Sequence, residues 1–203
     1  MVRVKVCGVT SLDDARVCVE AGVDAIGLNF WPSSVRRCDE RVARAIVDAF
    51  GADTLMVGVF VDESEAEILR IRAEVGLACV QLHGDEPPEL VARFLPHAYK
   101  ALRVRDASIA ERVRAFPGEH VLLDAYVKGR PGGTGATFDW TLARTIARER
   151  KVTLAGGLTA DNVADAVRAV RPYCVDTASG VELAPGVKDA DLVRAFVRNA
   201  RDA

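Results

Sequence analysis

Three apolar runs in this chain each end on a side chain that can take part in acid–base chemistry: Cys7, Asp124 and Asp176. Short apolar runs bounded by glycine or turn residues are typical of buried strands, so each run would deliver its polar group at the end of a strand. Because the C-terminal ends of parallel strands meet at one face of a sheet, we expect these three side chains to share a site. For Asp124 alone, a structural carboxylate that caps a loop amide is the alternative.

Cys7 and Asp124 are suited to act as a proton-transfer pair, with a thiolate as base and a carboxylic acid as donor. Lys5 would lie on the same strand face as Cys7 and could lower the pKa of the thiol. The alternative, that Cys7 is a small buried hydrophobic residue, stays open from position alone. Asp124 would be a general acid only if a partly apolar surrounding raised its pKa enough to keep it protonated near neutrality.

Glycine-bearing segments follow the last three predicted strands and indicate a site for a phosphate-bearing ligand. Glycine lets backbone amides approach a ligand closely, and a following helix start directs its free N–H groups toward an anion. In barrels of alternating strands and helices, the loops after strands 7 and 8 are the usual phosphate site. The candidate residues are Gly133, Thr134 and Gly135, then Gly156 and Gly157, then Ser179 and Gly180.

Arg36, in the loop after the second predicted strand, is a candidate to bind a carboxylate, because a guanidinium can hold both carboxylate oxygens. A solvated loop arginine is the alternative, and the adjacent Arg37 makes the choice ambiguous from local sequence. His83 ends the fourth predicted strand and is one of only three histidines, so the sequence offers no credible metal site and predicts no metal.

Strand-like and helix-like stretches alternate along the whole chain, which predicts βαβ units and a parallel sheet. The strands are expected near 2–7, 24–30, 55–61, 78–82, 98–103, 120–124, 151–155 and 173–177. The helices are expected near 12–21, 39–50, 64–75, 87–94, 107–115, 139–149, 161–170 and 189–201, with Ser11 and Asp139 as two of the N-caps. Eight such units predict an α/β fold, a single compact (β/α)8 barrel over residues 1–203.

An open doubly wound sheet is the second choice of fold, but the first strand–helix turn lacks the glycine fingerprint of dinucleotide-binding sheets. Side-chain alternation refines the barrel prediction. Val2, Val4 and Val6 would face the helices, whereas Lys5 and Cys7 would face the barrel axis together with Arg3, Leu122, Asp124, Cys174 and Asp176.

Composition narrows the class of partner. The 203 residues carry a formal net charge of −2, and no apolar run approaches the length of a membrane span, so neither nucleic acid nor a membrane is expected as a partner. The chain starts directly in a predicted strand, so we expect no signal peptide. The five cysteines are odd in number and lack Cys-x-x-Cys spacing, which favours free thiols and a cytoplasmic location. A monomer and a homodimer are both left open.

Taken in order, these segments resemble the phosphoribosylanthranilate isomerase family of tryptophan biosynthesis over nearly the whole chain. The segments that carry the resemblance are Lys5-Val6-Cys7-Gly8-Val9-Thr10, Gly27-Leu28-Asn29-Phe30, Ser34, Arg36, Gly58-Val59-Phe60, Gln81-Leu82-His83-Gly84, Leu123-Asp124, Gly132-Gly133-Thr134-Gly135, Phe138-Asp139-Trp140, Ala155-Gly156-Gly157-Leu158, Asn162-Val163, Asp176-Thr177-Ala178-Ser179-Gly180-Val181-Glu182 and Pro185-Gly186-Val187-Lys188-Asp189.

The resemblance implies an Amadori rearrangement of N-(5-phosphoribosyl)anthranilate on a barrel that uses neither metal nor organic cofactor. It assigns Cys7 as general base, Asp124 as general acid and Arg36 to the anthranilate carboxylate. Asp176 would position the ligand near the sugar, and backbone amides of the glycine-bearing segments would bind the phosphate. One departure is Ala178, where the family often has serine before Ser179.

Two rival functions remain open. The first is another phosphate-binding barrel isomerase, such as a sugar-phosphate epimerase, although its metal-dependent members need histidines at strand ends. The second is a non-catalytic barrel that binds a phosphorylated ligand, against which the presence of both Cys7 and Asp124 argues.

Overall fold

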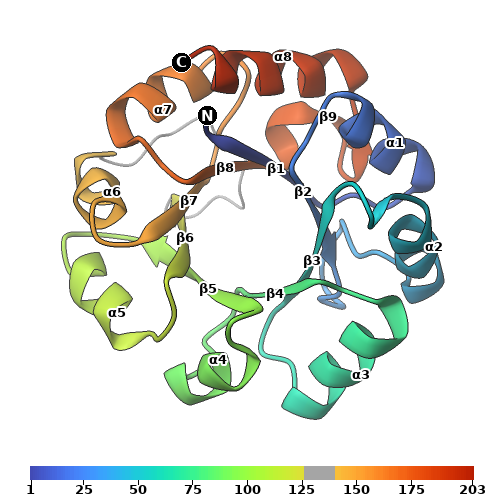
Figure 1. The fold of residues 1–203 in the computed structure, drawn as a ribbon, viewed down its shortest axis with the longest axis horizontal. Coiled ribbons are helices and arrows are strands. Elements are labelled where there is room, and N and C mark those ends of the chain that lie inside the picture. Colours follow the sequence, from blue (N-terminus) through green and yellow to red (C-terminus); the bar gives the residue numbers. More distant parts are fainter. Residues whose placement is uncertain (126–139) are drawn as a thin grey trace.

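The computed structural model describes residues 1–125 and 140–203, and in these residues eight parallel strands close into a barrel with the helices outside it (Figure 1). Each strand pairs with its neighbours in the chain, and β1 also pairs with β8, which closes the ring. The strands are β1 (Arg3–Cys7), β2 (Ala25–Asn29), β3 (Leu55–Phe60), β4 (Cys79–Leu82), β5 (Ala98–Val104), β6 (His120–Ala125), β7 (Lys151–Ala155) and β8 (Cys174–Thr177). The predicted (β/α)8 barrel is confirmed.

The outer ring consists of α1 (Leu12–Glu20), α2 (Glu40–Phe50), α3 (Glu65–Val75), α4 (Pro88–Phe94), α5 (Ile109–Ala115), α6 (Trp140–Ala147), α7 (Val163–Val170) and α8 (Ala190–Arg201). Ser11 caps α1 as predicted, because its side chain accepts a hydrogen bond from the amide of Asp14. The predicted cap at Asp139 lies outside the described residues. The predicted segments differ from these bounds by two residues or fewer at any end.

Hydrophobic side chains form two separate layers on the two faces of the barrel strands. The larger layer lies between strands and helices and includes Val4 and Val6. The smaller layer fills the barrel interior and consists of Ala25, Val57, Tyr99, Ala101, Leu122 and Ala155. The interior position of Leu122, and of the buried Lys5 and Asp176 that pair across β1 and β8, confirms the predicted facing of these strands.

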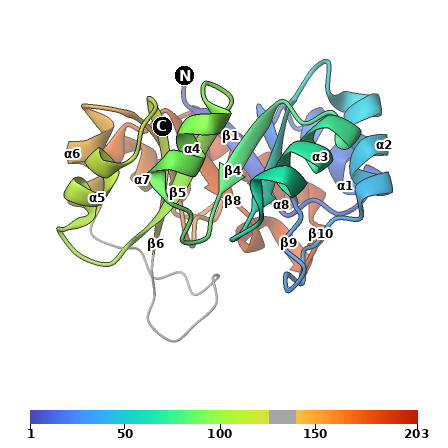
Figure 2. The same cartoon turned by 90° about the horizontal axis from the view of Figure 1, so that it is seen from below.

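A short 3-10 helix, η1 (Ser179–Val181), follows β8 and leads into a small antiparallel hairpin, β9 (Glu182–Ala184) with β10 (Val187–Lys188). The sequence did not predict this hairpin. Figure 2 shows it at the end of the barrel opposite to the N-terminus, which is the end where the parallel strands finish. Among the described residues no helix is long and apolar enough to span a membrane.

Candidate active site

Cys7 lies half-buried at the C-terminal end of β1, beside the interior Lys5. Gly27 on β2 leaves the space that both side chains border, since a Cβ at Gly27 would lie 2.7 Å from Cys7 Sγ and 3.0 Å from Lys5 Nζ. Burial raises the pKa of the Cys7 thiol, and the charge of Lys5 opposes that rise. The charge of Lys5 therefore acts to lower the pKa of Cys7, as the sequence suggested. The effect of burial is larger, however, so the pKa of Cys7 lies above its ordinary value.

Lys5 and Asp176 form an ion pair inside the barrel, with Lys5 Nζ 3.0 and 3.1 Å from the two carboxylate oxygens. Burial alone would lower the pKa of Lys5, but the charges of Asp176 and Cys7 raise it well above its usual value, so the ammonium stays charged. The pair joins strands β1 and β8 beneath Cys7, in the register Lys5 opposite Asp176. It places a fixed positive charge next to the thiol.

Asp124, at the end of β6, lies at the same end of the barrel as Cys7 and close to His83, which follows β4. His83 Nε2 and Asp124 Oδ2 are 3.4 Å apart. On the other side of the ring, His83 Nδ1 is 2.9 Å from the Gln81 amide nitrogen, and the Gln81 oxygen accepts the Tyr99 hydroxyl at 2.9 Å. With the amide oriented in this way, Nδ1 is the acceptor and the proton is carried by Nε2, the nitrogen nearer to Asp124.

The side chain of Arg36 reaches the same rim through a tightly organised loop between β2 and α2. Ser34 Oγ accepts hydrogen bonds from the Asn29 side chain at 3.2 Å and from the Arg36 amide at 3.1 Å. The stem of Arg36 packs on Gly8, where a Cβ would come within 2.6 Å of Arg36 Cδ and where φ is +73°. Glycine suits this position because it has no side chain to clash with Arg36 and readily adopts a positive φ.

Glu182 on β9 binds the Arg36 guanidinium side-on, with Arg36 Nε 2.8 Å from Glu182 Oε1 and Arg36 Nη2 2.7 Å from Glu182 Oε2. This contact occupies one edge of the guanidinium, and Nη1 makes no hydrogen bond with any of the described residues. Arg37, by contrast, is exposed and lines a separate surface cleft with residues of α2, such as Arg41 and Arg44. The structure therefore favours Arg36 over Arg37 as the arginine of the site.

The glycine-bearing segments after β7 and β8 come together on the same rim. Thr177 Oγ1 donates to the Leu158 carbonyl at 2.7 Å, and a Cβ at Gly180 would collide with that carbonyl. Gly156 and Gly157 both adopt positive φ, at +90° and +68°. The loops that hold Gly156, Gly157, Ser179 and Gly180 are thus neighbours, whereas Gly133, Thr134 and Gly135 lie outside the described residues.

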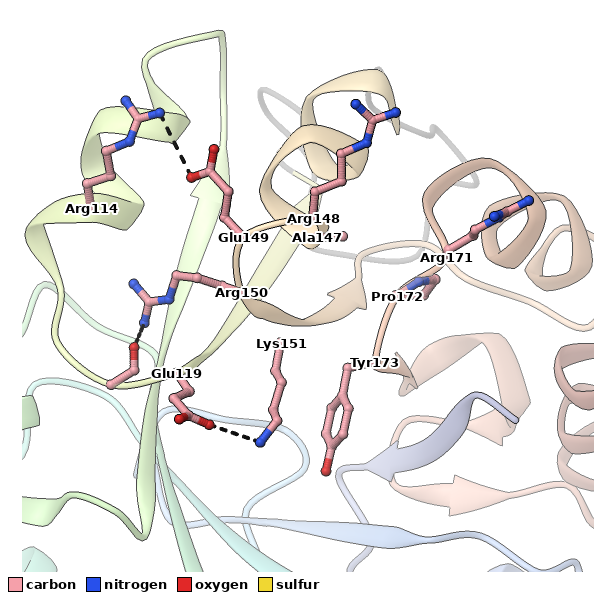
Figure 3. Close-up of a pocket in the computed structure, with 11 residues that line it drawn as sticks. Arg114, Glu119, Ala147, Arg148, Glu149, Arg150, Lys151, Arg171, Pro172 and Tyr173 are labelled. Atoms are coloured by element: carbon pink, nitrogen blue, oxygen red, sulfur yellow. Dashed lines mark hydrogen bonds and ion pairs between the residues drawn. The ribbon is translucent and has the colours of Figure 1, made fainter.

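A cleft of about 770 Å³ opens at the other end of the barrel, at the N-terminal ends of β7 and β8 (Figure 3). Two of its basic side chains have local partners: Lys151 pairs with Glu119 at 3.0 Å, and Arg150 donates to the backbone carbonyls of Val113 and Phe116. It contains none of the side chains discussed above. Among residues 1–125 and 140–203 no group of three or more His, Cys, Asp or Glu side chains could hold a metal ion.

Comparison with known proteins shows the family of the chain. The family model of N-(5'-phosphoribosyl)anthranilate isomerase matches residues 4–199. The chain belongs to this family. It is 44% identical over 204 residues to the isomerase of Trichlorobacter lovleyi, with both chains covered in full, and 48% identical to that of Myxococcus xanthus, covering 98% of this chain and 96% of the relative. The crystal structure of the Thermotoga maritima isomerase superposes with a TM-score of 0.92 at 42% identity, with both chains covered in full.

The chain is therefore an isomerase on a (β/α)8 barrel. Two features of its site were missed by sequence reasoning: the side-on contact of Glu182 with Arg36, and the buried Lys188, which contacts the same glutamate. Both residues fall in segments that carried the family resemblance, but a glutamate and a lysine in short polar stretches look like surface residues from sequence alone. Only the pairing of β9 with β10 shows that they are neighbours.

Proposed function

We propose that this isomerase catalyses the Amadori rearrangement of N-(5'-phosphoribosyl)anthranilate to 1-(2-carboxyphenylamino)-1-deoxyribulose 5-phosphate in tryptophan biosynthesis, by general acid–base catalysis. The observation that carries the proposal is the placement of Cys7 and Asp124 at one end of the barrel interior, with the Lys5–Asp176 ion pair beneath Cys7. A related isomerase, 39% identical over the full length of both chains, was crystallised with reduced 1-(o-carboxyphenylamino)-1-deoxyribulose 5-phosphate.

In the first step Asp124 protonates the ribose ring oxygen. The bond from that oxygen to C1 breaks, and the lone pair of the anthranilate nitrogen forms a C=N bond, which gives an open-chain Schiff base. Asp124 leaves this step as a carboxylate. The Nε2–H of His83, 3.4 Å from one carboxylate oxygen, holds the acid in place and stabilises the anion that forms.

In the second step the Cys7 thiolate removes the proton from C2 of the sugar. The electron pair of that C–H bond forms a C1=C2 double bond while the π pair of the C=N bond returns to nitrogen, which gives an enolamine. The enolamine ketonises when C1 gains a proton and the C2 hydroxyl loses one. Because burial raises the pKa of Cys7, the ammonium of Lys5 is needed to keep a usable fraction of thiolate. Neither step requires a metal ion, since protons are the only species exchanged with the sugar.

The two ends of the substrate are held by different parts of the rim. The free edge of the Arg36 guanidinium binds the anthranilate carboxylate in a charge-assisted contact. The phosphate is bound by backbone amides around Gly156-Gly157 and Ser179-Gly180, whose loops are joined through Thr177 and Leu158, and by the segment at Gly133-Thr134-Gly135. Asp176 lies below the sugar, where its pairing with Lys5 keeps it fixed.

Ala178 has no hydroxyl to offer a phosphate. If family members use only the backbone amide at this position, Ala178 changes little. If they use a serine hydroxyl, this chain binds phosphate somewhat more weakly, and Ala178→Ser lowers the KM.

A fluorescence assay that follows loss of the anthranilate substrate in the purified protein tests the proposal directly. The substrate also releases free anthranilate by hydrolysis. Mass analysis of the product distinguishes the two reactions, because the rearranged product keeps the mass of the substrate whereas hydrolysis gives anthranilate. Turnover to the deoxyribulose phosphate is the expected result. Slow release of free anthranilate at the uncatalysed rate contradicts the proposal and favours a non-catalytic barrel.

Chelation separates the proposal from a metal-dependent epimerase. EDTA should leave the activity unchanged, because proton transfer between Cys7, Asp124 and the sugar needs no Lewis acid. Loss of activity with EDTA that added metal restores would favour the epimerase instead.

The location and assembly of the protein are part of the same proposal. We place the isomerase in the cytoplasm, where a reducing environment suits its free cysteines at positions 7, 18, 38, 79 and 174. A related structure from Thermotoga maritima is described as a monomeric form generated from a dimeric isomerase. For this chain, a monomer and a homodimer are the two states that light scattering should distinguish.

A further inference from the structure

We propose that Glu182 and Lys188 are positioning residues, which fix the Arg36 guanidinium so that its free edge selects a ligand carrying a carboxylate. The inference rests on the proposed role of Arg36 and goes beyond it, because it makes carboxylate selectivity depend on a pair that does not itself touch the ligand. The pair belongs to the β9–β10 hairpin, where Lys188 lies opposite Glu182.

The contact between Arg36 and Glu182 leaves the guanidinium little freedom. Arg36 Nε lies 2.8 and 3.0 Å from the two Glu182 oxygens, and Nη2 lies 2.7 Å from Oε2. The Glu182 side chain is 4% exposed, whereas the Arg36 side chain is 24% exposed. A guanidinium has five N–H donors in a rigid plane, so fixing the Nε edge also fixes the direction of the opposite Nη1 edge.

Lys188 holds the glutamate from the other side. Its side chain is 0% exposed, and Nζ lies 2.7 Å from Glu182 Oε1. The Gly186 amide donates to the same oxygen at 3.2 Å. Burial would raise the pKa of Glu182, but the hydrogen bonds from Arg36 and Lys188 lower it, so the carboxylate remains charged and both cations keep their partner.

The same ammonium ties the pair to two other parts of the site. Lys188 Nζ donates to the carbonyl of Cys7 at 2.7 Å and to the carbonyl of Ala178 at 3.3 Å. The amide of Lys188 donates to Asp14 on α1 at 2.8 Å, which anchors β10 to the barrel wall. One buried cation therefore links the strand that carries the base, the loop before Ser179, and the glutamate that orients Arg36.

A pair with a purely structural role would stabilise the fold without affecting which ligand is preferred. The two roles are separated by the ratio of dissociation constants for two ligands, measured by calorimetry on the full-length protein. The first is reduced 1-(o-carboxyphenylamino)-1-deoxyribulose 5-phosphate, and the second is the same compound made from aniline, which lacks the carboxylate. Wild-type protein should bind the first ligand more tightly.

Glu182→Gln should reduce this ratio by at least about threefold, as expected for coupled neighbours, and should reduce it less than Arg36→Met does. In the Arg36→Met background, Glu182→Gln should leave the ratio unchanged, because its effect passes through Arg36. Glu182→Asp keeps the charge but moves it away from the guanidinium, so it should also reduce the ratio of dissociation constants. This variant replaces Glu182→Gln in the test if the glutamine variant does not fold.

Glu86→Gln is the matched control, because Glu86 forms a similarly buried pair with Lys100 at 3.0 Å, away from Arg36. It should lower the melting temperature and leave the ratio as in wild type. An equal loss of the ratio in Glu86→Gln and Glu182→Gln overturns the positioning role. So does a normal ratio in both Glu182 variants when Arg36→Met lowers it. If Arg36→Met itself leaves the ratio unchanged, the failure lies in the proposed role of Arg36.

Discussion

The two ends of the barrel interior are built from the same strands, yet their buried titratable side chains differ in the charged partners that they have. At the N-terminal end His120 is enclosed between aromatic rings, 4.2 Å from that of Tyr99 and 5.6 Å from that of Tyr173, and its Nε2 lies 2.7 Å from Thr153 Oγ1. Burial lowers the pKa of His120 to about 4. Burial also raises the pKa of Cys174, which lines the same enclosed space, to about 12.

At the C-terminal end, burial also raises the pKa of Cys7 and of Asp176, but the buried charged groups there have charged partners. Lys5 pairs with Asp176, and Glu182 with Arg36, while Cys7 and Asp124 remain half-buried at the rim. The comparison shows that burial by itself makes a titratable group neutral and inert. A reactive group needs a neighbouring fixed charge and an open side, and only the loops at the strand ends provide both.

The strongest test of this contrast compares two cysteines at the two ends. Cys7→Ala should lower kcat by about 10²–10⁴-fold with a modest change in KM, because it removes a positioned base and leaves the binding residues in place. Cys174→Ala removes a thiol that burial keeps protonated, and should leave kcat close to that of the wild type. Steady-state kinetics of both variants give the answer. Near-normal turnover in Cys7→Ala contradicts its assignment as base.

Asp124→Asn keeps the shape of the side chain but cannot deliver a proton, so kcat should again fall by orders of magnitude. The wild-type profile of kcat/KM against pH should be bell-shaped, since a free thiolate and a protonated carboxyl are both required. In Asp124→Asn the fall of kcat/KM on the high-pH side, which is caused by loss of the proton from the acid, should disappear. A flat wild-type profile across neutral pH, with chemistry shown to be rate-limiting, would remove this pair from the mechanism.

Arg36→Met tests ligand binding at the charged end, with a smaller expected effect. Loss of a charge-assisted hydrogen bond of roughly 1.5–3 kcal/mol should raise KM or the product dissociation constant by about 10- to 150-fold and disturb kcat much less than Cys7→Ala does. Arg37→Met is the matched control and should change little, because Arg37 lines a different surface. Weaker binding in Arg37→Met alone would move the carboxylate contact to the neighbouring residue.

The smallest effect on activity is expected at the enclosed end, where His120 should influence stability and not turnover. Its pKa in the folded state is about 4, below the ordinary 6.5, so the unfolded state binds the proton more readily. Stability from this group is complete above pH 6.5 and is lost as the pH falls toward 4, by up to about 3 kcal/mol. His120→Gln should flatten that part of the stability curve, measured by urea unfolding. An unchanged slope would mean that His120 is not enclosed.

Local sequence accounts for the elements and for which strand faces turn inward. Alternation along β1 separates Val4 and Val6 from Lys5 and Cys7, because successive side chains of a strand point to opposite faces whatever the rest of the chain does. The serine cap of α1 is also local, since donor and acceptor are three residues apart. These local features are sufficient to place Cys7, Asp124 and Asp176 at one end of the barrel.

Only the tertiary structure decided how the charges at that end are paired. Lys5 and Asp176 are separated by 171 residues in the chain, and Arg36 and Glu182 by 146. No local pattern records such a partner, because the contacts arise when barrel closure brings β1 next to β8 and the β9–β10 hairpin folds over the rim. These long-range contacts decide the preference for Arg36 over Arg37, the direction of the pKa shift at Cys7 and the proposed roles of Glu182 and Lys188. Their strength is set by burial, which the sequence alone does not specify.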